Sequence, residues 1–275
     1  MAIAKIGVVQ FWPKLFEVEK NLRKALNLVK DFDGDFLIFP ELSFTGYLFN
    51  SEKEIERVSR FNRMVERRWM EFSRDKKCTV IFGFPEKEKV NFFNSSMMIF
   101  PDGKKRIYRK THLFSEEKKF FKPGDTGFFV EEFRGVKVGL AICFDWFFPE
   151  SFRTLSLMGA DLIAHSANLV MPYCQDSNVY ASLQNRVYIA TANRWGKDTN
   201  QGKELIFTGK SQITAPNGIT LKKASERGDT LLEVEINTAF SKDKRINKFN
   251  DVFEDRKPKF YVNLFYKGKN GENGR

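Results

Sequence analysis

Three side chains that could act together in catalysis each follow a short strand-like segment of the sequence. Glu41 comes after FLIFP, Lys110 after RIYR, and Cys143 after VKVGLAI. In open α/β sheets, ligands bind in the crevice beyond the carboxyl ends of the strands. If the three segments are neighbouring strands, their side chains converge there. The thiol would be a nucleophile, the carboxylate its base and the ammonium an electrostatic stabiliser.

Each of these residues, taken alone, also has a plainer interpretation. A single cysteine after an apolar strand is more often a small buried residue than a nucleophile. Glu41 could cap a turn, and Lys110 could be a solvated strand end. This interpretation weakens when the three are taken together, because all of them occupy the same kind of position.

The sequence around these positions resembles the nitrilase superfamily of carbon–nitrogen hydrolases. FPELSFTGY, YRKTHLF and GLAICFDWFFPE are similar to its three motifs, in the same order. The flanking segments NSSMMIFPDG, HSANLVMPY, NRVYIATANRWG, GKSQITAPNG and NDVFEDRKPKFY agree as well. The resemblance covers roughly residues 4 to 262. One such motif would be weak, but three in order are highly specific.

The resemblance implies a Glu-Lys-Cys triad formed by Glu41, Lys110 and Cys143. It also implies a second carboxylate seven residues after the lysine, which is Glu117 here. Neither a metal nor an organic cofactor is expected. The implied reaction is the hydrolysis of an amide, nitrile or N-carbamoyl amine through a thioester on the cysteine, without cleavage of peptides.

Substrate contacts are expected from three further positions. Asn168 follows the segment DLIAHS and should border the cleft, and Tyr47 and Phe144 could line it. The backbone N–H of Phe144 is a second candidate donor to the developing negative charge. Core packing is an equally reasonable role for the two aromatic rings. The sequence does not indicate which compound is the substrate.

Other functions remain open at this point. His112 or His165 could replace the carboxylate as the base, as in Cys–His hydrolases. An acyltransferase would use the same thioester and pass it to an amine. The net charge of +11 permits a basic nucleic-acid-binding protein on an inactive scaffold. Lysine and arginine are interleaved with glutamate along the chain, however, so no specific nucleic-acid partner is expected.

The hydrophobic pattern predicts an α/β fold. Strands are expected at 4–11, 35–40, 78–84, 161–166 and 187–193, and helices at 17–32, 51–76, 149–159 and 177–186. Hairpins are expected around Pro101-Asp102-Gly103 and Arg134-Gly135, and a β section after residue 203. The first part of this pattern alone suggests a largely parallel sheet. The family resemblance implies a four-layer α-β-β-α sandwich with mixed sheets.

The chain should form one domain, residues 1–262, followed by a basic tail, residues 263–275. The sequence has three cysteines, a small and odd number that argues against a disulfide framework. This favours a reducing compartment, and the cytoplasm is expected. No apolar run is long enough to span a membrane. The resemblance further implies pairing of subunits through outer helices, so a homodimer or larger homo-oligomer is expected. Gln184 stands where many relatives carry Glu, which leaves subunit contacts or pocket polarity in question.

Overall fold

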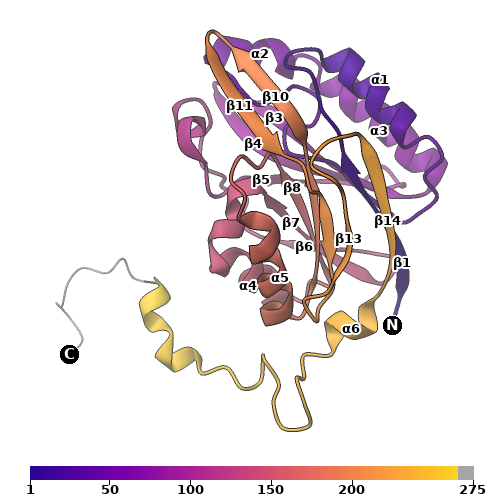
Figure 1. Ribbon diagram of the computed structural model, residues 1–275, viewed down its shortest axis with the longest axis vertical. Coiled ribbons are helices and arrows are strands. Elements are labelled where there is room, and N and C mark those ends of the chain that lie inside the picture. Colours follow the sequence, from indigo (N-terminus) through magenta and orange to yellow (C-terminus); the bar gives the residue numbers. More distant parts are fainter. Residues whose placement is uncertain (266–275) are drawn as a thin grey trace, which may run out of the picture. The chain divides into compact units, whose positions relative to one another are not determined.

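Two six-stranded mixed sheets form the centre of the structure, a computed structural model that describes residues 1–265 (Figure 1). The first sheet has the order β14-β1-β2-β3-β4-β5. Its strands are β1 (Ile3–Gln10), β2 (Phe36–Ile38), β3 (Thr79–Glu88), β4 (Asn91–Ile99), β5 (Lys105–Arg109) and β14 (Thr230–Asn237). Only the β1–β2 and β2–β3 pairs are parallel.

The second sheet has the order β13-β12-β9-β8-β7-β6 and is parallel at β7–β8 and β8–β9. Its strands are β6 (Val130–Phe133), β7 (Val136–Ile142), β8 (Leu162–Ala167), β9 (Tyr188–Asn193), β12 (Gln212–Thr214) and β13 (Thr220–Lys223). A separate hairpin pairs β10 (Trp195–Asn200) with β11 (Lys203–Thr208).

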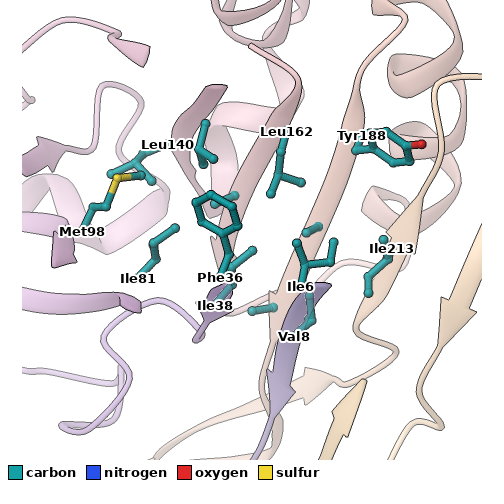
Figure 2. Packing of buried hydrophobic residues seen from close by; sticks show 14 of the residues in the cluster. Ile6, Val8, Phe36, Ile38, Ile81, Met98, Leu140, Leu162, Tyr188 and Ile213 are labelled. Atoms are coloured by element: carbon teal, nitrogen blue, oxygen red, sulfur yellow. The ribbon is translucent and has the colours of Figure 1, made fainter. Parts of the chain in front are cut away.

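Apolar side chains from both sheets form the core between them (Figure 2). The first sheet contributes Ile6, Val8, Phe36, Ile38, Ile81 and Met98, and the second contributes Leu140, Leu162, Tyr188 and Ile213. Burying this surface between two sheets supplies most of the favourable free energy of such a layer. The core holds the ends of strands from both sheets in fixed positions.

Helices cover the outer face of each sheet, which gives four layers. The helices α1 (Val18–Leu28), α2 (Glu52–Ser59) and α3 (Asn62–Lys76) pack on the first sheet. The helices α4 (Pro149–Leu157) and α5 (Cys174–Asn185) pack on the second, and the short α6 (Thr238–Lys242) follows β14. The predicted α-β-β-α sandwich with mixed sheets is therefore confirmed.

Several local predictions need correction. A single helix was expected over 51–76, but the chain forms α2 and α3 with a break at Arg60 and Phe61. The parallel pairing suggested by the first part of the pattern is present at β1–β2 and β2–β3, but the sheet continues with the antiparallel pairs β3–β4 and β4–β5. Strand β10, with the polar sequence WGKDTN, has no apolar alternation and was not predicted. Both predicted hairpins, β4–β5 and β6–β7, are present.

The chain divides into two compact units, Met1–Asp243 and Lys244–Arg275. The sheets and outer helices belong to the first unit. Short 3₁₀ turns at Pro258–Phe260 and Val262–Phe265 belong to the second. A domain boundary at residue 262 stays a prediction, and most of the predicted basic tail lies outside the described residues. None of the helices within residues 1–265 is long and apolar enough to cross a bilayer.

Gly83 in β3 allows the chain that follows β2 to approach closely. Its N–H and C=O bond to Pro40 and Ser43, on either side of Glu41, and a Cβ here would lie 2.4 Å from the Leu42 nitrogen. We expect Gly83→Ala to lower the free energy of unfolding by about 1–3 kcal/mol, because the backbone must shift. Denaturant unfolding measures this change.

The cross-strand partner of Gly83 provides the matched control. Ser96 on β4 is paired with Gly83, and its hydroxyl has no hydrogen-bond partner within the described residues. Ser96→Ala should therefore be nearly neutral. Equal stability of Gly83→Ala and Ser96→Ala would show that the close approach is not needed.

Candidate active site

Glu41 lies in the turn that follows β2, and it is fully buried. Ser43 N–H donates to the Gly83 carbonyl, and Gly83 N–H donates to the Pro40 carbonyl, so both sides of Glu41 are tied to β3. Leu42 has a φ of +44°, in the left-handed region that L residues adopt at a cost. The turn is thus held in one conformation that aims the carboxylate inward.

Lys110 follows β5 and places its ammonium between two carboxylates. Its Nζ lies 2.6 Å from Glu41 Oε1 and 2.8 Å from Glu117 Oε1, and all three side chains are shielded from solvent. Asn94 on β4 donates its Nδ2 to Glu41 Oε1 at 2.7 Å and accepts the Lys110 N–H at its carbonyl. The two carboxylates and the amide therefore fix the ammonium in space.

Cys143 begins a short 3₁₀ turn, Cys143–Phe147, directly after β7. Its φ of +40° is unusual for a residue other than glycine, and backbone strain of this kind clusters at functional sites. Asp145 stabilises the turn by accepting the Ile142 N–H at 2.9 Å. The sulfur is buried, with the residue only 6% exposed.

Asp145 also connects the cysteine turn to the lysine segment. Its Oδ2 accepts the hydroxyl of Tyr108 at 2.8 Å, and its Oδ1 lies 2.8 Å from His112 Nδ1. Tyr108 and His112 stand on either side of Lys110. One buried carboxylate thus locks the segments that carry Lys110 and Cys143 against each other, although they come from different sheets.

Asn168 bridges the glutamate and the cysteine. Its Nδ2 donates to the backbone carbonyl of Glu41 at 2.9 Å, and its backbone N–H favours the ionised form of Cys143 and so opposes the rise of that pKa. Its Oδ1 has no hydrogen-bond partner in residues 1–265. The structure therefore brings Asn168 to the site, as expected for a residue that borders the cleft, and leaves one amide oxygen for a ligand.

Burial controls the ionisation of the three central groups. It raises the pKa of Glu41 to about 7, although Lys110 pulls that pKa down. It also raises the pKa of the Cys143 thiol, and the negative charge of Glu41 adds to this shift. Burial alone would lower the pKa of Lys110, but Glu117 and Glu41 outweigh it and raise that pKa. At neutral pH the lysine is an ammonium and the resting thiol is protonated.

One oxygen of Glu41 stands ready to accept a proton. Oε1 is used by Lys110 and Asn94, whereas Oε2 is buried and has no hydrogen-bond partner within the part of the chain that the structure describes. The negative charge of this carboxylate raises the pKa of the Cys143 thiol. A buried acceptor of this kind with a pKa near 7 suits a general base.

Tyr47 and Glu117 extend the network away from the cysteine. The Tyr47 hydroxyl donates to Glu117 Oε1 at 2.6 Å, and burial raises the pKa of Tyr47. The Tyr47 N–H in turn donates to Asp198 Oδ2 at 2.8 Å. Asp198 is held by two hydrogen bonds, 2.8 and 2.9 Å long, from the fully buried guanidinium of Arg194.

The two histidines lie close to the site but contact other atoms than the thiol. His165 Nε2 lies 2.9 Å from the Cys143 carbonyl oxygen, and burial lowers the pKa of His165 to about 4. Nε2 donates to this carbonyl in the neutral ring, so His165 supports the backbone of the turn. His112 stacks on the ring of Phe148 at 3.7 Å. These contacts favour the carboxylate over a histidine as the base.

Sequence reasoning missed four residues of the site: Asn94, Asp145, Arg194 and Asp198. Asn94 and Asp145 lie inside quoted motifs, where a polar residue among apolar neighbours is the available signal. Asp198 lies on β10, the strand that was not predicted, and Arg194 lies directly before it. No pattern in the sequence connects this pair to Tyr47, about 150 positions earlier, because the contact arises only in the folded chain.

A cavity of about 360 Å³ adjoins this network, and Tyr47 and Glu117 line it. Phe144 lines a different cavity, beside His112 and Phe148. Its ring packs against Phe114 at 5.1 Å. The structure thus contains a buried thiol, a buried carboxylate and a fixed ammonium, and the network around the ammonium extends through Glu117 and Tyr47 to a cavity of suitable size for a small molecule. This arrangement is typical of a thiol-dependent hydrolase.

Comparisons with known proteins give the same class. The family model of the Carbon-nitrogen hydrolase family matches residues 5–245. The nitrilase of Pyrococcus abyssi is 40% identical over 264 residues, which cover 94% of this chain and 99% of the relative. An (R)-stereoselective amidase of Pseudomonas is 31% identical over 226 residues, or 80% of each chain.

A solved carbon-nitrogen hydrolase of Helicobacter pylori G27 has the same fold. It superposes with a TM-score of 0.87 at 22% identity and covers 97% of this chain and 99% of its own. The chain therefore belongs to the carbon–nitrogen hydrolase family, within the nitrilase superfamily, and is an enzyme that hydrolyses non-peptide carbon–nitrogen bonds. The resemblance stated from the three motifs is confirmed.

The buried pair Arg194–Asp198 should matter for both stability and turnover. Asp198→Asn leaves the guanidinium without a charged partner, so we expect the free energy of unfolding to fall by about 3–5 kcal/mol. The hydrogen bond to the Tyr47 N–H weakens as well, and kcat/KM should fall. Chemical denaturation and steady-state kinetics measure the two effects.

Glu71→Gln is the control for Asp198→Asn, because Glu71 lies on α3 in an exposed ion pair with Arg67. This control should change neither quantity appreciably. Asp198→Glu keeps the charge and should retain more stability than Asp198→Asn. Unchanged stability and turnover in Asp198→Asn would contradict the role given to the pair.

Proposed function

We propose that Cys143 is the nucleophile, Glu41 the general base and acid, and Lys110 the electrostatic stabiliser of a hydrolase for amides or nitriles. The observation that carries this proposal is the difference between the contacts of the two Glu41 carboxylate oxygens. One carboxylate oxygen binds Lys110 at 2.6 Å, and the other is buried without a partner in the described chain. A carboxylate held in this way can take a proton and return it.

The first half of the reaction forms a thioester. Cys143 Sγ attacks the substrate carbon while its proton passes to Glu41. The negative charge that develops on the attacked atom is stabilised by the Lys110 ammonium, and we assign the second donor to the backbone N–H of Phe144. Glu41 then gives its proton to the departing nitrogen, and ammonia or an amine leaves.

The second half releases the acid. A water molecule gives a proton to Glu41 and attacks the thioester carbon, and the thiol leaves with the proton that Glu41 returns. The product is a carboxylic acid, and Cys143 is regenerated. A nitrile forms a thioimidate first, and one further water is consumed before ammonia leaves.

We propose that Glu117 positions the ammonium of Lys110. It lies 2.8 Å from Lys110 Nζ and accepts the Tyr47 hydroxyl at 2.6 Å, so it holds the ammonium toward the substrate and need not transfer protons. Asn168, with one free amide oxygen in the described chain, and Tyr47 are assigned to substrate binding. The nitrilase and amidase named above support amides and nitriles as the substrate classes.

We assign the protein to the cytoplasm. All three cysteines, Cys78, Cys143 and Cys174, are buried free thiols, which fits a reducing compartment. A thiol nucleophile also has to stay reduced to act. The assignment rests on this chemistry of the cysteines.

A homodimer is proposed as the smallest assembly, with α4 and α5 at the interface. Both helices expose large apolar side chains: Leu157, Met158, Tyr180 and Leu183 are 40–66% exposed. Gln184 is exposed on α5, so its replacement of the family's usual Glu concerns this surface and not the pocket. Large apolar side chains exposed on neighbouring helices are consistent with an interaction surface.

Sedimentation should show a dimer for the intact chain and a shift toward monomer for Tyr180→Asp, because the substitution places a charge in the interface. Ile3→Asp is the control, since Ile3 is exposed to a similar extent but lies on β1 in the other sheet. A monomeric intact chain would rule the dimer out.

Removal of the nucleophile gives the direct test of the proposed reaction. We expect Cys143→Ala to release no ammonia from a panel of amides and nitriles, because no thioester can form. Intact-mass spectrometry of the unmodified enzyme with a slow substrate should show an acyl adduct on Cys143. Cys78→Ala, which removes another buried thiol, should keep turnover. Ammonia release that survives in Cys143→Ala would disprove the assignment.

A further inference from the structure

We infer that the cavity beside Glu117 binds the acyl part of the substrate and selects uncharged, apolar acyl groups. This inference rests on the proposed function, since it assigns the substrate class of the same site. Three observations support it: the position of the cavity, the chemistry of its walls and the pairing of the charges at its rim.

The cavity lies next to the reacting groups. Tyr47 and Glu117 line it, and Glu117 contacts the ammonium of Lys110 at 2.8 Å. The Tyr47 hydroxyl donates to the same Glu117 oxygen at 2.6 Å, so it belongs to the same network. We place the rest of the carbon chain of a substrate held on Cys143 in this space, because the network that begins at Lys110 reaches the cavity wall at Glu117.

The walls of the cavity are mostly apolar. Leu48 and Phe49 come from the segment after Glu41, and Leu205 comes from β11. Aromatic rings from the segment around the 3₁₀ turn Ser115–Lys119 complete the lining: Phe114, Phe120 and Phe121. A volume of about 360 Å³ with such walls suits an aliphatic chain of several carbons or a phenyl ring.

Charged residues at the cavity are already paired with each other. Glu116 accepts from Lys119 at 2.5 Å and from Lys203 at 2.7 Å, and Glu204 pairs with Lys197 at 2.6 Å. Glu117 is engaged by Lys110 and Tyr47. A charged group on the substrate would lose its own hydration against the aromatic wall, which is costly, and it would gain little from charges that already have partners.

The β10–β11 hairpin, labelled in Figure 1, provides a matched pair of positions. Leu205 lines this cavity, whereas Ile206 is 67% exposed and lines another cavity beside Trp12 and Trp195. The alternation follows from the strand, in which successive side chains point to opposite faces. A large residue can thus be placed on either side of the same strand.

The first experiment compares three substrates of similar length but different charge. Hexanamide is neutral, 6-aminohexanamide is cationic and the monoamide of adipic acid is anionic, and the matching nitriles form a second series. We expect kcat/KM for hexanamide to exceed that for either charged compound by about tenfold or more. Equal or better turnover of a charged compound would overturn the inference.

The second experiment changes the size of the cavity. Leu205→Trp should lower the ratio of kcat/KM for hexanamide to kcat/KM for acetamide by about tenfold, because the indole fills space that only the longer chain needs. Ile206→Trp should leave this ratio at the wild-type value. The same ratio in both variants would contradict the inference.

A second variant at Leu205, designed to gain activity on a cationic amide, tests the inference even if Leu205→Trp fails to fold. Leu205 is half-buried, so Leu205→Glu is tolerable and should raise turnover of 6-aminohexanamide relative to hexanamide. No gain for the cationic amide in Leu205→Glu would count against the cavity as the acyl site.

Failure of the inference is distinguishable from failure of the proposed function. If acetamide is hydrolysed through Cys143 but acyl length and charge have no effect, the cavity is not the acyl site and the reaction stands. If neither amides nor nitriles release ammonia, or release survives in Cys143→Ala, the proposed reaction itself is wrong.

Discussion

The site depends on one buried ammonium shared by two carboxylates. Lys110 lies 2.6 Å from Glu41 and 2.8 Å from Glu117, in space closed to water. Moving these charges out of water is costly, and removal of one partner from a buried ion pair typically costs about 3–5 kcal/mol. The arrangement persists because Asn94, Tyr47 and the backbone supply the remaining hydrogen bonds. The two-sheet core and the turn beside Gly83 hold these donors in place.

The same burial sets the chemistry. It keeps the resting thiol of Cys143 protonated and brings the pKa of Glu41 to about 7, so the proton can move between them near neutral pH. Lys110 remains charged, because the carboxylates outweigh its desolvation. A free thiolate would be open to oxidation and alkylation. Here the nucleophile is generated only as the substrate carbon is attacked.

The sequence indicated the three central residues through local patterns, whereas the four-layer sandwich was implied by the family resemblance. Glu41, Lys110 and Cys143 each follow a strand-like segment within a recognisable motif. The break between α2 and α3 was missed because it does not interrupt the helical spacing of apolar residues. Strand β10 was missed because its sequence lacks the apolar alternation of a strand. The support of Tyr47 by Asp198 was also beyond reach, because tertiary structure alone brings these residues together.

The pH dependence of Cys143 alkylation tests the central claim most directly. The rate with iodoacetamide, followed as adduct on the Cys143 peptide, should rise through about pH 7 as Glu41 loses its proton and becomes able to accept that of the thiol. In Glu41→Gln the rise should move to much higher pH, whereas the control Glu235→Gln, at an exposed position of β14, should follow the wild type. Identical profiles for Glu41→Gln and the wild type would contradict the account.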